Sequence, residues 1–253
     1  LKVGADYLRR LLPTAAVLIS DPSWENHRAL FESAGFRVEN YPYYDAASRG
    51  VAFDAMKACL AGLPAGAIVV LHACCHNPTG ADLSEAQWKE VVEAIRARDL
   101  VAFIDMAYQG FADGIEPDAL ALRLFAASGL QFFVSSSFSK SFSLYGERVG
   151  ALSIVTASRD ESARVMSQVK RVVRTNYSNP PTHGGAIVAA VLSSPELRKL
   201  WEEELAGMRE RIRAMRTGLV DKLKARGVAQ DFSFVARQRG MFSYTGLTAE
   251  QVE

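Results

Sequence analysis

The chain has 253 residues, of which 49% are hydrophobic and 23% are charged, and its formal net charge at pH 7 is +1. This balance argues against a strongly basic nucleic-acid-binding protein and against a surface attracted to anionic membranes. No apolar run approaches the roughly 20 residues that a membrane-spanning helix needs. The first twelve residues lack the pattern of a signal peptide. We therefore expect a globular protein that binds neither nucleic acid nor membrane.

The cysteine content points to a reducing compartment. Cys59, Cys74 and Cys75 are too few for a disulfide framework, and two of them are adjacent. We therefore expect a cytoplasmic protein with free thiols. No pair has the C-x2-C spacing of zinc sites, so no metal is expected.

Short apolar runs alternate with helical patterns along the first part of the chain. After an amphipathic helical pattern at 1–12, strands are predicted at 16–20, 37–41, 67–73, 101–105, 132–136 and 149–155. Helices are predicted between them at 26–34, 53–61, 84–98 and 119–128, and Ser84 with Gln87 fits a capping box. Apolar strands separated by helices indicate the α/β class, with a mostly parallel mixed sheet between helices.

Beyond residue 155 the pattern is mainly helical. Helices are predicted at 158–175 and 182–192 and, with Pro195 in the first turn, at about 195–225. Residues 232–236 and 241–245 are predicted as strands at the start of a smaller α+β domain. We expect a large domain at 1–207 and an incomplete small domain at 208–253. Because a helical pattern is already under way at Leu1 and another is unfinished at Glu253, we expect a fragment lacking both ends.

Polar side chains follow three of the predicted strands. His76-Asn77-Pro78-Thr79-Gly80 follows the third strand, Asp105 ends the fourth with Tyr108 after it, and Ser137-Phe138-Ser139-Lys140 follows the fifth. Taken singly, each has a structural explanation, since a strand-end Asp is often a cap or turn former and a Lys is usually solvated. Ligands bind in open α/β sheets at the carboxyl ends of the strands. The combination of amide, carboxylate, phenol and amine at that edge therefore indicates one site.

Five stretches carry a resemblance to a known family. They are residues 20–27 (SDPSWENH), 72–80 (HACCHNPTG), 103–111 (FIDMAYQGF), 136–150 (SSFSKSFSLYGERVG) and 174–181 (RTNYSNPP). On these motifs the chain resembles class I aminotransferases of the aspartate and aromatic amino acid (tyrosine) type, over essentially its whole length. The resemblance implies the pyridoxal-phosphate-dependent transferase fold (fold type I) and the cofactor pyridoxal 5'-phosphate. It also implies transfer of an amino group from an aromatic or dicarboxylic amino acid to 2-oxoglutarate.

The resemblance assigns catalytic roles to Lys140, Asp105 and Tyr108. Lys140 would hold the cofactor covalently and later move a proton, and burial beside cations would lower its pKa. Asp105 would pair with the pyridine nitrogen and keep the ring protonated. Tyr108 and Asn77 would hydrogen-bond the ring oxygen beside the aldehyde.

Further residues would complete the cofactor site by the same resemblance. Trp24 would stack on the ring, and His27 would steady the Asp105 carboxylate. Ser137, Ser139 and Arg148 would bind the phosphate, since a guanidinium fork suits a dianion. The alternative for Arg148 is a surface ion pair with Glu147. His72 and His76 are interpreted as scaffold rather than as catalysts.

Arg174 resembles the arginine that crosses the subunit boundary in this family to bind a substrate's side-chain carboxylate. Asn77 and Trp24 would also face the substrate. The structural alternative for Arg174 is a solvated arginine at a helix end. The functional interpretation requires a homodimer with composite active sites.

The substrate preference rests on analogy alone. Several stretches, among them residues 21–27 and 238–246, are closer to the aromatic branch, with aspartate aminotransferase as the alternative. Two other classes remain open: a cofactor-binding sensor domain without activity, and an inactive, incompletely folded fragment. The family's phosphate loop, its α-carboxylate-binding arginine, and the N-terminal arm with a tyrosine that reaches the neighbour's phosphate are not within these residues. We therefore expect weak cofactor binding and slow turnover from these residues alone.

Overall fold

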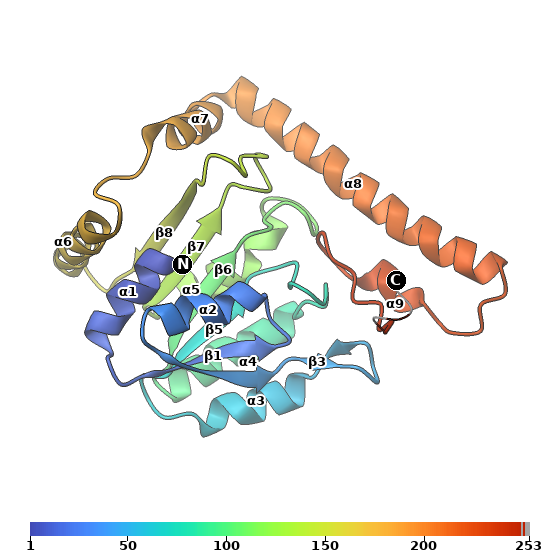
Figure 1. The fold of residues 1–253 in the computed structure, drawn as a ribbon, viewed down its shortest axis with the longest axis horizontal. Helices are drawn as coiled ribbons and strands as arrows, with labels where there is room; N and C mark the ends of the chain where they lie inside the picture. Colours follow the sequence, from blue (N-terminus) through green and yellow to red (C-terminus); the bar gives the residue numbers. More distant parts are fainter. Residues whose placement is uncertain (249, 251–253) are drawn as a thin grey trace.

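A six-stranded sheet forms the centre of the computed structural model, which describes residues 1–248 and 250. Its strands run in the order β2 (Arg37–Pro42), β1 (Ala16–Asp21), β5 (Ile68–His72), β6 (Val101–Met106), β7 (Phe132–Ser137) and β8 (Gly150–Val155) (Figure 1). Neighbouring strands are parallel except β7 and β8, which are antiparallel. The mostly parallel mixed sheet expected from the sequence is confirmed.

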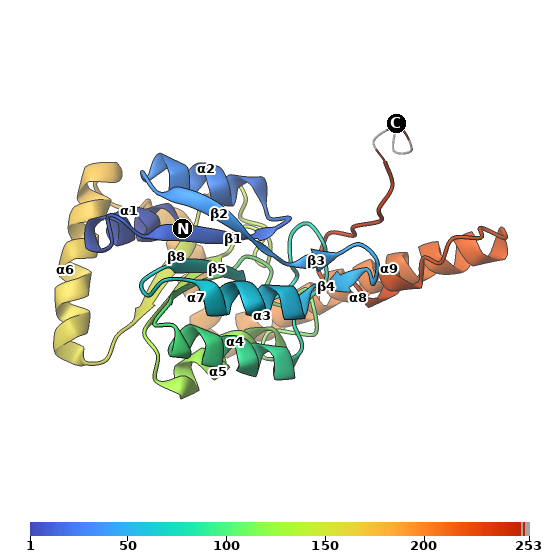
Figure 2. The same ribbon diagram turned by 90° about the horizontal axis from the view of Figure 1, so that it is seen from below.

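Helices cover both faces of this sheet (Figure 2). On one face, α3 (Phe53–Gly62), α4 (Glu85–Ala97) and α5 (Leu120–Ser128) pack against strand residues such as Ile104. On the other face, α1 (Lys2–Leu11), α2 (Glu25–Ser33) and α6 (Arg159–Asn176) pack around residues such as Phe103. Phe103 and Ile104 are neighbours in β6 but belong to different cores, because successive side chains of a strand point to opposite faces.

The predicted elements agree closely with the observed ones in this part of the chain. Each of the six predicted strands lies within one residue of its observed bounds. The capping box of α4 is confirmed, since Ser84 Oγ accepts a hydrogen bond from the Gln87 backbone N–H and Gln87 Oε1 accepts one from the Ser84 N–H. The capping box can be predicted from the sequence because its two residues, Ser84 and Gln87, lie within one helical turn of each other.

The last helices form an arm along one side of the molecule. α7 (Thr182–Ser193) leads into α8 (Pro195–Ala225), which begins at the Ser194 cap and descends along the right-hand side in Figure 1. Leu205 of α8 packs against Tyr108 and Phe111 in the loop after β6. No helix among the described residues combines the length and the apolar character needed to cross a membrane.

Two predicted strands are wrong. Residues 232–236 largely form α9 (Ser233–Arg237), and residues 241–245 have no regular secondary structure. The adjacent residues Phe234 and Val235 are both buried, which suits a short helix packed on α8 better than a one-sided strand. Two short paired strands, β3 (Tyr44–Asp45) and β4 (Gly50–Val51), carry no clear sequence signal. The helix expected from Thr248 falls mostly outside the described residues, and the division into domains at 207/208 stays a prediction.

Candidate active site

The carboxyl ends of β5, β6 and β7 meet at one edge of the sheet, because these strands are parallel neighbours. A pocket of about 450 Å³ opens at this edge. Its walls include six of the residues predicted from the sequence, namely Trp24, Asp105, Ser137, Ser139, Lys140 and Arg148. His27, Tyr108 and Asn77 lie just behind the wall, in contact with one another or with the wall residues. The structure therefore brings nine predicted residues to one place.

Asp105 is the buried carboxylate of the pocket. It ends β6, only 6% of its surface is exposed, and its two oxygens have separate partners. Oδ2 lies 2.9 Å from Nε2 of His27, and Oδ1 accepts a 2.9 Å hydrogen bond from the Ser135 hydroxyl. Burial alone would raise the pKa of Asp105, but the hydrogen bonds from His27 and Ser135 and the electrostatic interaction with His27 outweigh it, so the pKa is lowered. An ionised carboxylate therefore faces the pocket.

His27 reaches Asp105 because it lies in the first turn of α2, on the side that faces the sheet. It is fully buried, and its Nδ1 is 3.0 Å from the Ser23 hydroxyl. Trp24, the residue before this helix begins, packs its ring edge-on against His27 at 5.3 Å and also lines the pocket. One helix start thus positions both side chains.

Lys140 lies in the turn that follows β7 and is half-buried. Its Nζ is 4.7 Å from the centre of the Tyr108 ring. Burial lowers the pKa of Lys140; the charge of Asp105 opposes this and that of Arg148 adds to it, and the net shift is downward. A lowered pKa raises the fraction of neutral amine, which is the form that adds to a carbonyl group.

Tyr108 and Asn77 form a polar pair beside Lys140. The Asn77 side-chain amide is 3.5 Å from the Tyr108 hydroxyl, at the long end of the range for a hydrogen bond. Burial raises the pKa of Tyr108 to about 12, so the phenol keeps its proton and can donate a hydrogen bond. Both groups are thus available as donors to an anionic oxygen in the pocket.

Hydroxyls and a guanidinium lie near the turn after β7. Ser137 Oγ accepts a hydrogen bond from the Ser139 backbone N–H, which shapes this turn. Arg148 is exposed and donates to the Tyr145 carbonyl at 2.8 Å, so the surface ion pair with Glu147 is not what the structure shows. Arg148 has a φ of +52°, which residues with a side chain rarely adopt and which is often associated with functional sites.

The structure does not bring Arg174 to this pocket. Arg174 lies in the last turn of α6, is exposed, and donates to the Ser178 hydroxyl. A role for Arg174 at a neighbouring subunit's pocket stays a prediction.

Three contacts were missed by the sequence reasoning. Ser135 stands directly opposite Asp105 in the register of β6 and β7 and donates to its carboxylate. The sequence signal that could have indicated this contact is a polar serine within an otherwise buried strand. Ser23 lies between His27 and His72, with its hydroxyl 3.5 Å from the His72 Nε2. His72 packs against His27 at 4.9 Å, and burial lowers its pKa well below the usual value. His72 therefore stands as a neutral group behind the carboxylate.

His76 is bonded into the scaffold. Its Nε2 lies 2.9 Å from the Ser20 hydroxyl and its Nδ1 lies 2.8 Å from the Thr79 hydroxyl, while its ring stacks on Tyr43. Burial lowers the pKa of His76 to about 3. His76 does not line the pocket, which fits the scaffold interpretation made for it.

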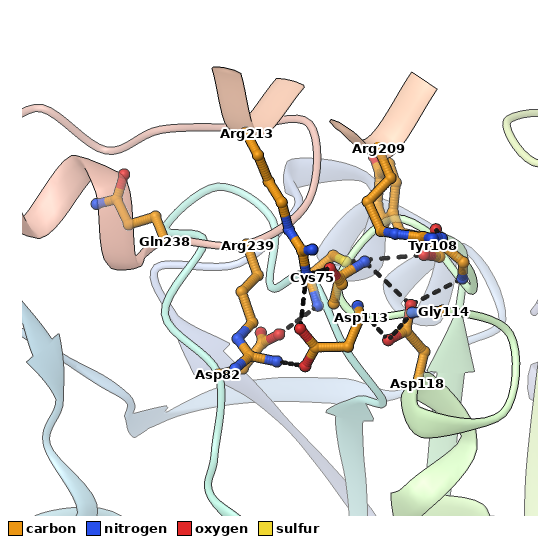
Figure 3. Close-up of polar contacts among 12 residues, drawn as sticks. Cys75, Asp82, Tyr108, Asp113, Gly114, Asp118, Arg209, Arg213, Gln238 and Arg239 are labelled. Carbon is orange, nitrogen blue, oxygen red and sulfur yellow. Dashed lines mark hydrogen bonds and ion pairs between the residues drawn. The ribbon is translucent and has the colours of Figure 1, made fainter. Parts of the chain in front are cut away.

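A second pocket, of about 540 Å³, lies beside the loops that follow β5 and β6. Its acidic residues already have partners (Figure 3). Each carboxylate oxygen of Asp118 accepts two backbone N–H groups, and Asp113 pairs with Arg213 and Arg239. With its carboxylates satisfied and no lysine in its walls, this larger pocket is the weaker candidate for an active site.

Cys74, Cys75 and Asp118 form a group whose ligand atoms are close enough together to hold a metal ion, judged on the described part of the chain. The oxygens of Asp118 are occupied by backbone donors, and burial raises the pKa of the Cys75 thiol well above its usual value. A metal ion would have to break hydrogen bonds to Asp118 and would have to replace the protons of the Cys74 and Cys75 thiols. We assign no metal to this group.

Comparison with known proteins decides the family. The model of the family "Aminotransferase class I and II" matches residues 1–253. The chain belongs to this family. Aspartate aminotransferase of Pseudomonas aeruginosa is 70% identical over 253 residues, which are 100% of this chain and 64% of that protein. Aromatic-amino-acid aminotransferase of Escherichia coli is 53% identical over 253 residues, which are again 100% of this chain and 64% of that protein.

The solved structures of aminotransferases agree with this assignment. The crystal structure of aromatic-amino-acid aminotransferase from Burkholderia pseudomallei, covalently bound to pyridoxal phosphate, matches 99% of this chain at 70% identity with a TM-score of 0.98, and 63% of that chain is covered. The predicted pyridoxal-phosphate-dependent transferase fold is therefore confirmed. The chain spans about 64% of the length of the curated relatives that it matches.

Proposed function

We propose that this protein is a pyridoxal-phosphate-dependent aminotransferase that transfers an amino group from an aromatic or dicarboxylic amino acid to 2-oxoglutarate. The observation that carries the proposal is the pocket itself, in which an amine of lowered pKa, Lys140, shares the walls with the ionised carboxylate Asp105. Titratable groups with shifted pKa values that share one pocket are typical of functional sites.

The donor set of the pocket fits this cofactor. Pyridoxal phosphate supplies an electron sink for the substrate carbanion when it is bound. Lys140 would hold it covalently and carry a proton at Nζ, and Asp105 would accept a hydrogen bond from the protonated ring nitrogen. His27, at 2.9 Å from Asp105, would keep that carboxylate ionised and oriented. Tyr108 would donate to the ring oxygen.

The remaining residues would orient the cofactor and the substrate. Asn77 would share the ring oxygen with Tyr108, and Trp24 would cover one ring face and limit water near it. Ser137, Ser139 and Arg148 would hold the phosphate; the hydroxyls act as donors and the guanidinium balances the charge. All of these except Asn77 and Tyr108 line the pocket.

Arg174 supports a homodimer. It is an exposed arginine outside its own pocket, as expected for a side chain that would bind a substrate carboxylate in a neighbouring subunit.

We place the large cofactor domain at 1–207 and the start of the small domain at 208–253. We also place the protein in the cytoplasm, where the thiols Cys59, Cys74 and Cys75 would stay reduced.

The substrate proposal covers both branches because similar proteins carry both names, aspartate and aromatic-amino-acid aminotransferase. The aromatic branch is the first choice on the stretches 21–27 and 238–246. The ratio of kcat/KM for tyrosine and aspartate, with 2-oxoglutarate as acceptor, decides between them.

The test uses visible absorbance of the purified protein with added pyridoxal phosphate, before and after addition of tyrosine or aspartate. We expect a cofactor band that changes with the amino donor and that is absent in Lys140→Ala. Lys222→Ala, which removes an exposed lysine of α8, is the matched control and should keep the band. If Lys140→Ala keeps more than about a hundredth of the transaminase activity, the proposal is wrong.

A further inference from the structure

A buried arginine of α8 holds the irregular segment 238–242. Arg216 is only 8% exposed, and its guanidinium donates to three backbone carbonyls, those of Gln238, Gly240 and Phe242. The planar fork with five donors is suited to gathering several carbonyls at one point. The shape of this segment therefore depends on a side chain from a different element.

The segment 238–242 interlocks with the loop 75–80 that carries Asn77. Gly240 lies so close to Cys75 that a Cβ on Gly240 would be 2.3 Å from the Cys75 Cβ, and a Cβ on Gly80 would be 2.9 Å from the Phe242 carbonyl. The Arg239 backbone N–H also donates to the Gly80 carbonyl at 2.8 Å. Figure 3 shows Gln238 and Arg239 beside the loop that carries Cys75. The two backbones are thus held in contact by one hydrogen bond and by the absence of side chains.

This contact reaches the polar pair of the pocket. The Phe242 ring packs edge-on against Tyr108 at 5.9 Å, and the Cys75 thiol lies 3.7 Å from the Tyr108 carbonyl. Asn77 follows Cys75 by two residues, and its amide reaches the Tyr108 hydroxyl. The segment therefore packs against Tyr108 and against the loop that carries Asn77.

We propose that Arg216 is a positioning residue, which places Asn77 and Tyr108 for their hydrogen bonds to the cofactor by holding segment 238–242 against loop 75–80. Arg216 does not line the pocket and touches no reacting atom. The inference rests on the proposed function for its role toward the cofactor, but the contact between the two backbones can be tested without any cofactor.

The experiment compares Arg216→Ala and Arg216→Lys with Arg211→Ala, an exposed arginine of the same helix. The first readout is the reaction of Cys75 with a thiol reagent in cofactor-free protein, followed by peptide mass spectrometry. Cys75 is 1% exposed and is covered by Gly240. We expect the rate of Cys75 modification to rise about tenfold or more in Arg216→Ala and by a smaller factor in Arg216→Lys. The rate should not change in Arg211→Ala.

The second readout is the pH titration of the cofactor's visible band. Hydrogen-bond donors to the cofactor's ring oxygen stabilise the anionic form of that oxygen and therefore lower the pH midpoint of the titration. Arg216→Ala should therefore raise the midpoint by about 0.5 to 1 on the pH scale, the size expected for one lost hydrogen bond. In an Asn77→Ala background the shift should be smaller, because Arg216 acts through Asn77. A general loss of stability would leave the midpoint in place.

Gly240→Ala provides an independent route if Arg216→Ala does not fold. It keeps Arg216 but forces the segment away from Cys75, and it should produce the same two changes. Unchanged Cys75 reactivity and an unchanged midpoint in folded variants would overturn the inference. If the wild type forms no Lys140-dependent band, the proposed function fails instead, and the Cys75 reactivity still decides whether Arg216 holds the segment.

Discussion

Replacing His27 by phenylalanine perturbs the carboxylate of the pocket with little change in shape. His27 is fully buried, Asp105 is 6% exposed, and their contact is 2.9 Å. Phenylalanine keeps a ring against Trp24 and His72 but removes the hydrogen-bond partner that the structure gives to Asp105 Oδ2. Leaving a buried, ionised carboxylate without one of its hydrogen-bond partners typically costs about 3 kcal/mol or more. We expect the free energy of unfolding at pH 7 to fall by about that amount.

The pH dependence of this loss has a definite sign. In the wild type the pKa of Asp105 is lowered below the usual 3.8, so its contribution to stability is present above that pH and is lost as the pH falls through the lowered pKa. Without His27, burial dominates and the pKa of Asp105 should rise, so that the ionised form destabilises the folded state. Protonation then removes this penalty. The stability difference between wild type and His27→Phe should therefore shrink as the pH falls from about 7 towards about 4.

Urea unfolding followed by circular dichroism at several pH values measures this difference. The control is Asp105→Asn, alone and combined with His27→Phe. In this background there is no carboxylate at position 105, so losing His27 cannot leave a buried charge without its partner. In that background His27→Phe should cost only about 1 kcal/mol, which gives a coupling energy of about 2 kcal/mol or more. Equal costs in the two backgrounds, or a difference that does not change with pH, would refute the electrostatic reasoning.

Three further predictions concern other residues. Ser84→Ala removes the capping box of α4 and should cost about 1 kcal/mol, lowering Tm by about 2–4 °C in thermal unfolding, and an unchanged Tm would contradict the cap. Asp118→Asn replaces an oxygen that accepts two backbone N–H groups and should cost about 2–4 kcal/mol in urea unfolding; a cost below about 0.5 kcal/mol would show that the bonds contribute little. Lys140 has a lowered pKa whereas the hydrogen bond and charge of Glu90 raise that of Lys57, so pyridoxal phosphate followed by borohydride at pH 8 should label Lys140 first. Equal labelling of the two lysines in peptide mass spectrometry would count against a perturbed Lys140.

Much of the fold and of the candidate site could be predicted from the sequence because the signals are local. Six apolar runs between helical patterns predicted the strands to within one residue, and Ser84 with Gln87 predicted the start of α4. Asp105 and Lys140 each lie at or just beyond the end of an apolar run, and the carboxyl ends of parallel strands share one edge. The convergence of the site therefore follows from the order of the elements.

The tertiary structure alone decided which groups touch these residues. Ser135 reaches Asp105 through the register of β6 and β7, which no local pattern encodes. Residues 241–245 have a strand-like composition, but the Phe242 carbonyl bonds the Arg216 side chain instead of a strand. Hydrogen-bond partners depend on which elements pack together. A strand pattern predicts a strand only where another strand lies within reach of its backbone.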